Sequence, residues 1–310
     1  MASLQLSMGI PSFSSAAPSD WEHLTEWAQL LEGAGFDRLL VSEHVAFGMN
    51  MDAYANPQTG GTVGGRQPTG PDGHWLEPLT TLTYLAARTR RIRLGTNILL
   101  AALRPAAVLA KTLATMDVLS GGRIDVGVGV GWQREEYDAA GVDFDRRGAI
   151  LDQTLDVCQR LWRENEVSYE SVDLSFERIH QMPKPVQPGG VPVWVSGTVN
   201  RAVARRLARF GQGWIPWGPD ARDVAGGIRR MRAAVERAGG DPDGFGVAGT
   251  LRVQTSPDGG LDLSAVAAGA ASLSNAGVTD LRMTHWPLPG ANRDRDIPAL
   301  VQAVRDAVGG

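Results

Sequence analysis

The chain has 310 residues, of which 43% are hydrophobic and 21% charged, and its formal net charge is −4. This composition is typical of a globular protein with enough apolar side chains to build a sizeable core without a metal or a disulfide. Basic and acidic residues are mixed along the chain, which argues against a nucleic-acid-binding protein, because such proteins gather basic residues on one face.

Cys158 is the single cysteine, so an intrachain disulfide is excluded. It lies within a helical pattern, and we expect it to be a small buried side chain rather than a nucleophile. No apolar run has the length of a membrane span, and the N-terminus lacks a signal-peptide pattern. We therefore expect a cytoplasmic protein that binds neither membrane nor nucleic acid.

Short apolar runs alternate with amphipathic helical patterns from one end of the chain to the other. We predict eight strands, at residues 4–10, 38–41, 92–99, 124–130, 191–195, 213–217, 245–253 and 280–284. We predict eight helices, at residues 20–34, 78–89, 106–119, 146–163, 200–210, 220–238, 263–275 and 293–308.

Apolar strands that are each followed by a helix indicate a parallel sheet with helical crossovers. Eight such units predict a (β/α)8 TIM barrel, α/β in class, that forms one domain over residues 1–310. An open, doubly wound sheet is the alternative, but no unit carries a convincing dinucleotide-binding fingerprint.

Two insertions interrupt this alternation. Residues 45–77, after the second strand, are rich in Gly, Pro, Asn and Thr, and residues 164–190 hold two short β-like runs before a proline-rich stretch. We expect both to lie at the face where the strands end, because loops at that face build the active site of a barrel. A long loop there is expected to act as a lid or a substrate wall.

The second predicted strand runs directly into Glu43 and His44. Desolvating either charge is costly unless the group finds a partner, so this pair at the barrel mouth is our candidate for catalysis. The alternative is a rim histidine that bonds to a neighbouring backbone group. We expect no metal site, because the other histidines show no ligand spacing.

Gly127, Gly129 and Gly131 alternate along the fourth predicted strand and should therefore project from one face of it. Such a face admits either a flat ring or a neighbouring strand at close range. Trp132 follows directly and is a candidate for stacking on a bound ring.

A second candidate binding segment follows the fifth predicted strand, where a helix begins. Its exposed first-turn amides and the helix dipole would favour an anion, although an ordinary N-cap explains the same residues. The segment consists of Ser196, Gly197, Thr198, Val199 and Asn200.

Together these features resemble the luciferase-like monooxygenase superfamily, and within it the branch assigned to the deazaflavin coenzyme F420. The resemblance covers residues 5 to 218. It is carried by four runs: GFDRLLVSEHV; RRIRLGTNILLAALRPAAVLAKTLATMDVLSGGRIDVGVGVGWQREEYDAAGVDFDRRG; MPKPVQPGGVPVWVSG; and ARFGQGWIPW.

The resemblance implies a barrel with a flavin or deazaflavin ring in its mouth and His44 near the reactive edge of that ring. It further implies a non-prolyl cis peptide bond between Asn97 and Ile98 that supports the ring. The phosphate tail of the cofactor would reach the segment from Ser196 to Asn200, where Ser196-Gly197 replaces the usual Gly-Gly. Glu43 and His44 would find their partners in the ring or the substrate.

The implied reaction is F420-dependent hydride transfer to or from an alcohol, a ketone or an activated alkene. The alternatives are a two-component monooxygenase that uses reduced flavin mononucleotide (FMN) and oxygen, and an inactive flavin-binding paralogue. We assign Phe13, Trp75 and Arg66 to substrate binding, with Arg66 as an anion anchor. The resemblance also implies a homodimer and admits a flavin or F420 reductase as partner.

Overall fold

The computed structural model describes residues 4–256, 259–284, 286 and 293–309. Eight parallel strands close into a barrel in the order β1, β12, β11, β10, β9, β6, β5, β3. The strands are β1 (Gln5–Gly9), β3 (Arg38–Val41), β5 (Arg93–Thr96), β6 (Ile124–Val128), β9 (Val193–Gly197), β10 (Gly213–Pro216), β11 (Gly246–Thr250) and β12 (Asp280–Met283). The predicted (β/α)8 barrel is confirmed, and the open sheet is excluded.

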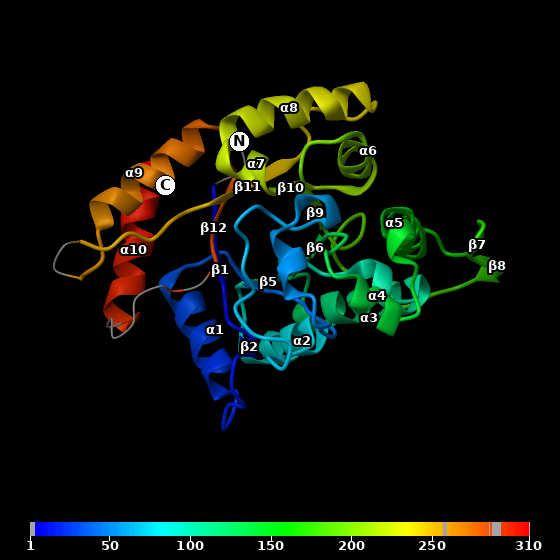
Figure 1. Cartoon of the computed structure of the whole chain (residues 1–310), viewed down its shortest axis with the longest axis horizontal. Helices are drawn as coiled ribbons and strands as arrows, with labels where there is room; N and C mark the ends of the chain where they lie inside the picture. Colours follow the sequence, from blue (N-terminus) through cyan, green and yellow to red (C-terminus); the bar gives the residue numbers. More distant parts are fainter. Residues whose placement is uncertain (1–3, 257–258, 285, 287–292, 310) are drawn as a thin grey trace.

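Eight helices surround the barrel (Figure 1). They are α1 (Glu22–Ala34), α2 (Pro78–Arg88), α3 (Ala106–Ser120), α5 (Arg147–Arg163), α6 (Arg201–Phe210), α8 (Val224–Arg237), α9 (Leu263–Asn275) and α10 (Arg293–Val308). Two further short helices, which the sequence did not predict, follow strands β6 and β10: α4 (Arg134–Ala139) and α7 (Pro219–Arg222).

The apolar core lies between the outer face of the barrel and the helices. Leu6, Met8, Leu39 and Val126 are almost completely buried there, alternating along their strands with residues that face inward. Strand residues alternate between the two faces of a sheet, so the inward set forms a second, separate layer.

The inward-facing residues at the end of the lumen opposite the mouth are charged, and those nearer the mouth are apolar. We call the charged end, formed by Arg38, Asp125 and Asp280, the floor of the barrel. Arg38 of β3 forms ion pairs with Asp125 of β6 and Asp280 of β12, although another strand separates it from each of them in the sheet. Arg38 also lies over the ring of Trp194, which packs in a small cluster with Ile215, Ala248 and Ile98. Contacts between strands that are not neighbours must cross the lumen, so these charges fill the inside of the barrel.

The insertion at 45–77 follows the C-terminal end of β3, as predicted. It contains the short helices η1 (Met51–Ala55) and η2 (Pro57–Thr59) and the strand β4 (His74–Trp75), which pairs with β2 (Phe13–Ser14).

The insertion at 164–190 begins and ends at the face opposite the mouth, so the prediction that it is a loop following a strand end was wrong. It follows helix α5 and leads into β9, and its Gln187 bonds to Arg93 and to the carbonyl of Ile124, at the N-terminal ends of β5 and β6. Its two β-like runs form the hairpin β7 (Val167–Glu170) and β8 (Ser175–Ile179), which projects from the body beside α5 (Figure 1). The hairpin runs along the outside of α5, where Asp173 pairs with Arg146 and Ser171 bonds to Gln153, so α5 separates it from the barrel mouth.

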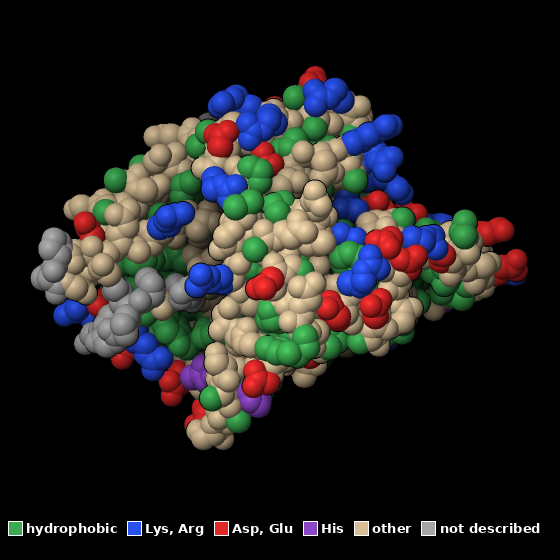
Figure 2. Space-filling model, viewed as in Figure 1, with side chains coloured by type: hydrophobic (Ala, Val, Ile, Leu, Met, Phe, Trp, Pro, Cys, Tyr) green, Lys and Arg blue, Asp and Glu red, His purple; other side chains and the backbone are tan. Residues whose placement is uncertain are grey.

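Figure 2 shows Lys and Arg side chains gathered over α6 and α8, whereas Asp and Glu side chains lie around the β7–β8 hairpin. Within the described residues, none of the helices combines the length and apolarity that a bilayer crossing needs.

Candidate active site

His44 lies in the barrel mouth, just beyond β3, and its side chain is only 8% exposed. Its Nδ1 lies 3.2 Å from Oε2 of Glu136, whose side chain is 1% exposed. The other oxygen of Glu136 accepts a 2.7 Å hydrogen bond from the amide of Val45. A carboxylate accepts hydrogen bonds, so Nδ1 of His44 is the donor in this pair, and Nε2 makes no bond to Glu136.

Glu136 is a residue of the candidate site that the sequence analysis missed. It lies on α4, 92 residues from His44, in the QREEYD stretch of the quoted second run. The Glu135-Glu136 pair in that stretch could have drawn attention to it, but nothing local indicates which of the two turns inward.

Aromatic rings surround His44. The ring centroids of Phe47, Trp75 and Trp132 lie 4.2, 4.8 and 5.8 Å from that of His44. Phe13 stacks on Trp75 with centroids 4.3 Å apart. Of the three residues predicted to contact substrate, the structure thus brings Phe13 and Trp75 together beside His44.

Arg66 is different, because it is exposed and lines an open surface cavity of about 480 Å³ within the insertion. The lining of that cavity includes Met51, Asp52 and Thr69 but not His44. Its role as an anion anchor stays a prediction.

Glu43 is buried, and its partners are protein groups rather than a ring or a substrate, contrary to the expectation from the sequence. The amide of Leu100 and Nη2 of Arg104 each donate to its carboxylate at 2.5 Å. Burial raises the pKa of Glu43, and the contacts with Arg104 and Leu100 oppose that shift. These contacts make Glu43 an anchor for the 97–104 segment, and its assignment to catalysis stays a prediction.

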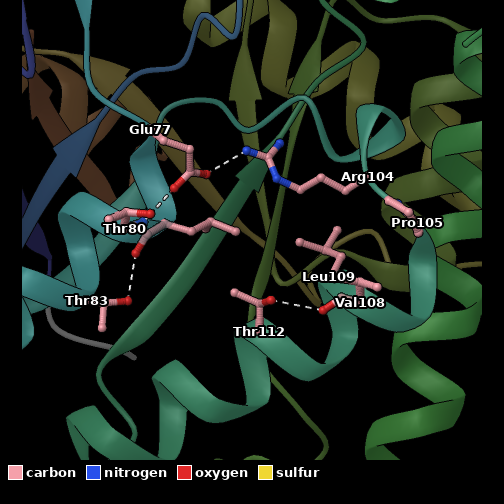
Figure 3. Close-up of a pocket in the computed structure, with 9 residues that line it drawn as sticks. Glu77, Thr80, Thr83, Arg104, Pro105, Val108, Leu109 and Thr112 are labelled. Atoms are coloured by element: carbon pink, nitrogen blue, oxygen red, sulfur yellow. Dashed lines mark hydrogen bonds and ion pairs between the residues drawn. The ribbon is translucent and has the colours of Figure 1, made fainter. Parts of the chain in front are cut away.

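Arg104 also bonds to Glu77 at 2.7 Å, at the start of α2. Both residues line a groove of about 450 Å³ between α2 and α3, on the outside of the barrel (Figure 3). Arg104 therefore connects this outer groove to the buried carboxylate of Glu43.

The peptide bond between Asn97 and Ile98 is cis, as the resemblance predicts. Both residues are half-buried where β5 ends. Two glycines just beyond the end of β6 face this segment: a Cβ on Gly129 would meet Cδ1 of Ile98 at 2.7 Å, and one on Gly131 would meet Cδ2 of Leu100 at 2.7 Å. The glycines thus admit the neighbouring chain, and any contact that Gly129 or Gly131 makes with a ring stays a prediction.

The Ser196–Asn200 segment joins β9 to α6. The side chain of Asn200 caps the helix by accepting from the amide of Val203 at 2.9 Å, so the N-cap interpretation is confirmed for this residue. The amide of Val199 is occupied by Asp220, which also pairs with Arg230.

Three other amides of this segment keep their capacity to bind an anion. Within the described residues, the amides of Thr198, Asn200 and Arg201 have no hydrogen-bond acceptor. Together with the helix dipole they fit a phosphate tail.

Polar groups at the mouth also fit a polar ring. The Oγ of Ser12 and the Oε1 of Gln133 are buried without a hydrogen-bond partner in the described part of the chain, and they follow β1 and β6. Buried polar atoms without partners are rare in folded proteins, and a bound polar group is one way to satisfy them. By contrast, no three His, Cys, Asp or Glu side chains of the described residues gather as a metal site.

Five hydrogen bonds hold the 45–77 insertion over the mouth. Val45 bonds to Glu136, and the carbonyl of Gly48 accepts from Gln133. Trp217 donates to the carbonyls of Gly60 and Gly61 at 3.1 and 3.2 Å, and Arg147 bonds to the carbonyl of Thr59. The insertion therefore covers the mouth, and its role as a lid stays a prediction.

Comparison with known proteins identifies the family. A model of the family described as luciferase-like monooxygenase matches residues 5–260. An uncharacterized protein of Mycobacterium tuberculosis is 36% identical over 191 residues, 61% of this chain and 65% of that protein. The match thus spans just under two thirds of the length of this relative.

A second relative carries a named activity. The F420-dependent glucose-6-phosphate dehydrogenase of Segniliparus rotundus is 30% identical over 218 residues, 69% of this chain and 57% of that protein. Among solved structures, the monooxygenase RslO1 of Streptomyces bottropensis shares the fold, with a TM-score of 0.75 at 20% identity, covering 98% of this chain and 99% of that one.

Proposed function

Because the chain belongs to the luciferase-like monooxygenase family, we propose that it is an F420-dependent oxidoreductase that transfers a hydride to or from an alcohol, a ketone or an activated alkene. The observation that carries this proposal is the buried His44–Glu136 pair in the mouth, beside the half-buried Asn97 and Ile98. The relative from Segniliparus rotundus supports F420 as the cofactor.

His44 is the proton-transfer group in this proposal. Hydrogen bonding to Glu136 fixes the tautomer and the orientation of its ring, which leaves Nε2 to accept a proton from a substrate hydroxyl or to return one to a carbonyl oxygen. Glu136 also stabilises the positive charge that the imidazole gains when it takes the proton. The same pair therefore serves both directions of the reaction.

The remaining residues bind, orient and exclude water. Asn97 and Ile98 would hold the ring, and the amides of Thr198, Asn200 and Arg201 would hold the phosphate. When bound, F420 supplies the hydride chemistry, and the protein supplies orientation and a dry site. The lid would exclude water from the site. The centroid of its Tyr54 ring lies 5.3 Å from that of Trp132.

A second candidate is a two-component monooxygenase that uses reduced FMN and oxygen. The closed aromatic lid supports it, because excluding water protects reactive oxygen species formed in such a site. This candidate needs a reductase as partner, whereas hydride transfer by F420 does not need one in the same complex.

A homodimer is the expected assembly in both cases. The lining of the outer groove between α2 and α3 includes Val108, an apolar side chain that is 60% exposed. Sedimentation of the purified chain tests this expectation.

Cofactor titration decides between the two candidates. The purified chain is titrated with F420 and with FMN, each oxidised and reduced, and binding is followed by fluorescence. Micromolar binding of F420 without binding of FMN supports hydride transfer, and a screen of alcohols, ketones and enones follows. Tight binding of reduced FMN supports the monooxygenase instead, whereas failure to bind either cofactor overturns both.

A further inference from the structure

The charged floor of the lumen carries more positive than negative charge. Three arginines, Arg38, Arg93 and Arg282, share two aspartates, Asp125 and Asp280. Asp125 lies between Arg38 and Arg93, and Asp280 lies between Arg38 and Arg282, at 2.7 Å in each case. Arginine stays protonated in proteins, so one positive charge in this network has no counter-charge of its own.

Arg282 is the member of the network that reaches toward the mouth. Its side chain is 7% exposed, and its guanidinium lies over the Trp194 ring, 4.6 Å from the centroid. While Nε donates to Asp280, Nη1 donates to Oδ1 of Asn97 at 3.1 Å. The network therefore ends at Asn97, the first residue of the cis Asn97-Ile98 bond at the mouth.

This contact fixes which way the Asn97 side chain points. A guanidinium only donates hydrogen bonds, so the oxygen of the Asn97 amide must face Arg282, and the NH2 group must face away from it. Within the described residues, that NH2 group has no hydrogen-bond acceptor. Asn97 is half-buried, so its free donor lies at the site rather than in open solvent.

We propose that Arg282 is a positioning residue for the redox cofactor: it orients Asn97 as a hydrogen-bond donor to the ring and places a buried positive charge beneath it. This inference rests on the proposed function, since it needs a flavin or a deazaflavin in the mouth. The reduced ring holds two more electrons than the oxidised ring, so a buried cation and an oriented donor favour the reduced form. Such an effect is large in a site that excludes water.

The test is the affinity of the protein for the two redox states of whichever cofactor, F420 or FMN, the wild-type chain binds. Arg282→Met removes the charge and the link to Asn97. We expect it to weaken binding of the reduced cofactor about tenfold more than binding of the oxidised one. For a two-electron couple this corresponds to a fall of about 30 mV in the midpoint potential of the bound cofactor.

Two further variants separate charge from structural support. Arg282→Lys keeps the charge, and we expect it to restore most of the potential. Asn97→Asp keeps an oxygen that faces Arg282 but neutralises the surplus charge with a matched ion pair. It therefore remains testable even where Arg282→Met fails to fold, and we expect a shift of at least the same tenfold size.

The outcomes are distinct. A potential that follows the charge at 282 and 97 supports the inference. Arg282→Met and Asn97→Asp proteins that bind both redox states with the wild-type ratio overturn it and leave the proposed function standing. A wild-type chain that binds neither cofactor overturns both.

Discussion

The floor and the mouth of the barrel are built from the same strands, but polar groups on the floor have protein partners, whereas some polar groups at the mouth have none among the described residues. On the floor each carboxylate is shared by two arginines, so Arg38, Asp125 and Asp280 satisfy one another. At the mouth Ser12 and Gln133 keep buried polar atoms without a partner among the described residues.

This difference separates stability from function within one fold. Paired charges on the floor become costly only when one partner is removed, because the other charge is then left buried. Open polar groups at the mouth cost the folded chain some stability, and a ligand can recover it. Substitutions of Arg38, Asp125 and Asp280 on the floor should therefore reduce stability, and substitutions at the mouth should reduce activity.

The largest effect is expected at His44. The change His44→Gln removes the proton-transfer group and should lower kcat by about 10²- to 10⁴-fold. Because the glutamine amide can still donate to Glu136, the urea midpoint should change little. A variant that keeps the wild-type kcat would show that His44 is a structural rim residue instead.

The floor should respond in the opposite way. Asp125→Asn leaves Arg38 and Arg93 without their shared carboxylate and should lower the free energy of unfolding by about 3–5 kcal/mol. Urea unfolding measures this. A loss below about 1 kcal/mol would contradict the view that the floor is a stability network.

Asp125 also predicts how stability depends on pH. Burial alone would raise the pKa of its carboxyl, but Arg38 and Arg93 outweigh burial and hold the pKa below its usual value of 3.8. A lowered pKa stabilises the fold above pH 3.8, and this stabilisation is lost as the pH falls through the lowered value. Urea midpoints measured from pH 6 to pH 3 should therefore fall, and Asp125→Asn should remove part of that dependence.

A smaller kinetic effect is expected at Glu136. Glu136→Gln keeps an acceptor for Val45 but offers an NH2 group to His44, which favours the tautomer with the proton on Nε2. We expect kcat to fall about 10- to 100-fold, with a shifted pH–rate profile. The matched variant Glu135→Gln, on the same helix, should leave both unchanged. Equal behaviour of the two variants would remove Glu136 from the mechanism.

The smallest effect is expected in the lid. Trp217→Phe removes the donor to the carbonyls of Gly60 and Gly61, a loss of about 0.5–1.5 kcal/mol. Hydrogen exchange of the lid should accelerate while the global unfolding free energy stays nearly constant. Trp27→Phe, on α1, is the control and should not change exchange in the lid. Unchanged exchange in Trp217→Phe would show that other contacts hold the lid.

The sequence by itself determined the fold. The spacing of apolar residues and the residue types at turns are local properties, so eight strand–helix units could be located from the sequence. Strand ends such as Glu43-His44 could then be assigned to the mouth. The resemblance added the cis bond at Asn97-Ile98 and the segment from Ser196 to Asn200.

Only the tertiary structure decided which residues pair through ion pairs and hydrogen bonds. Barrel closure brings Arg38 to Asp125 and Asp280, and α4 brings Glu136 to His44 across 92 residues. No local pattern encodes such a pairing, because it depends on which faces meet once the chain has closed. The same reason explains the 164–190 insertion: its composition resembles that of an active-site loop, but it follows a helix rather than a strand, and its hairpin packs on the outside of α5.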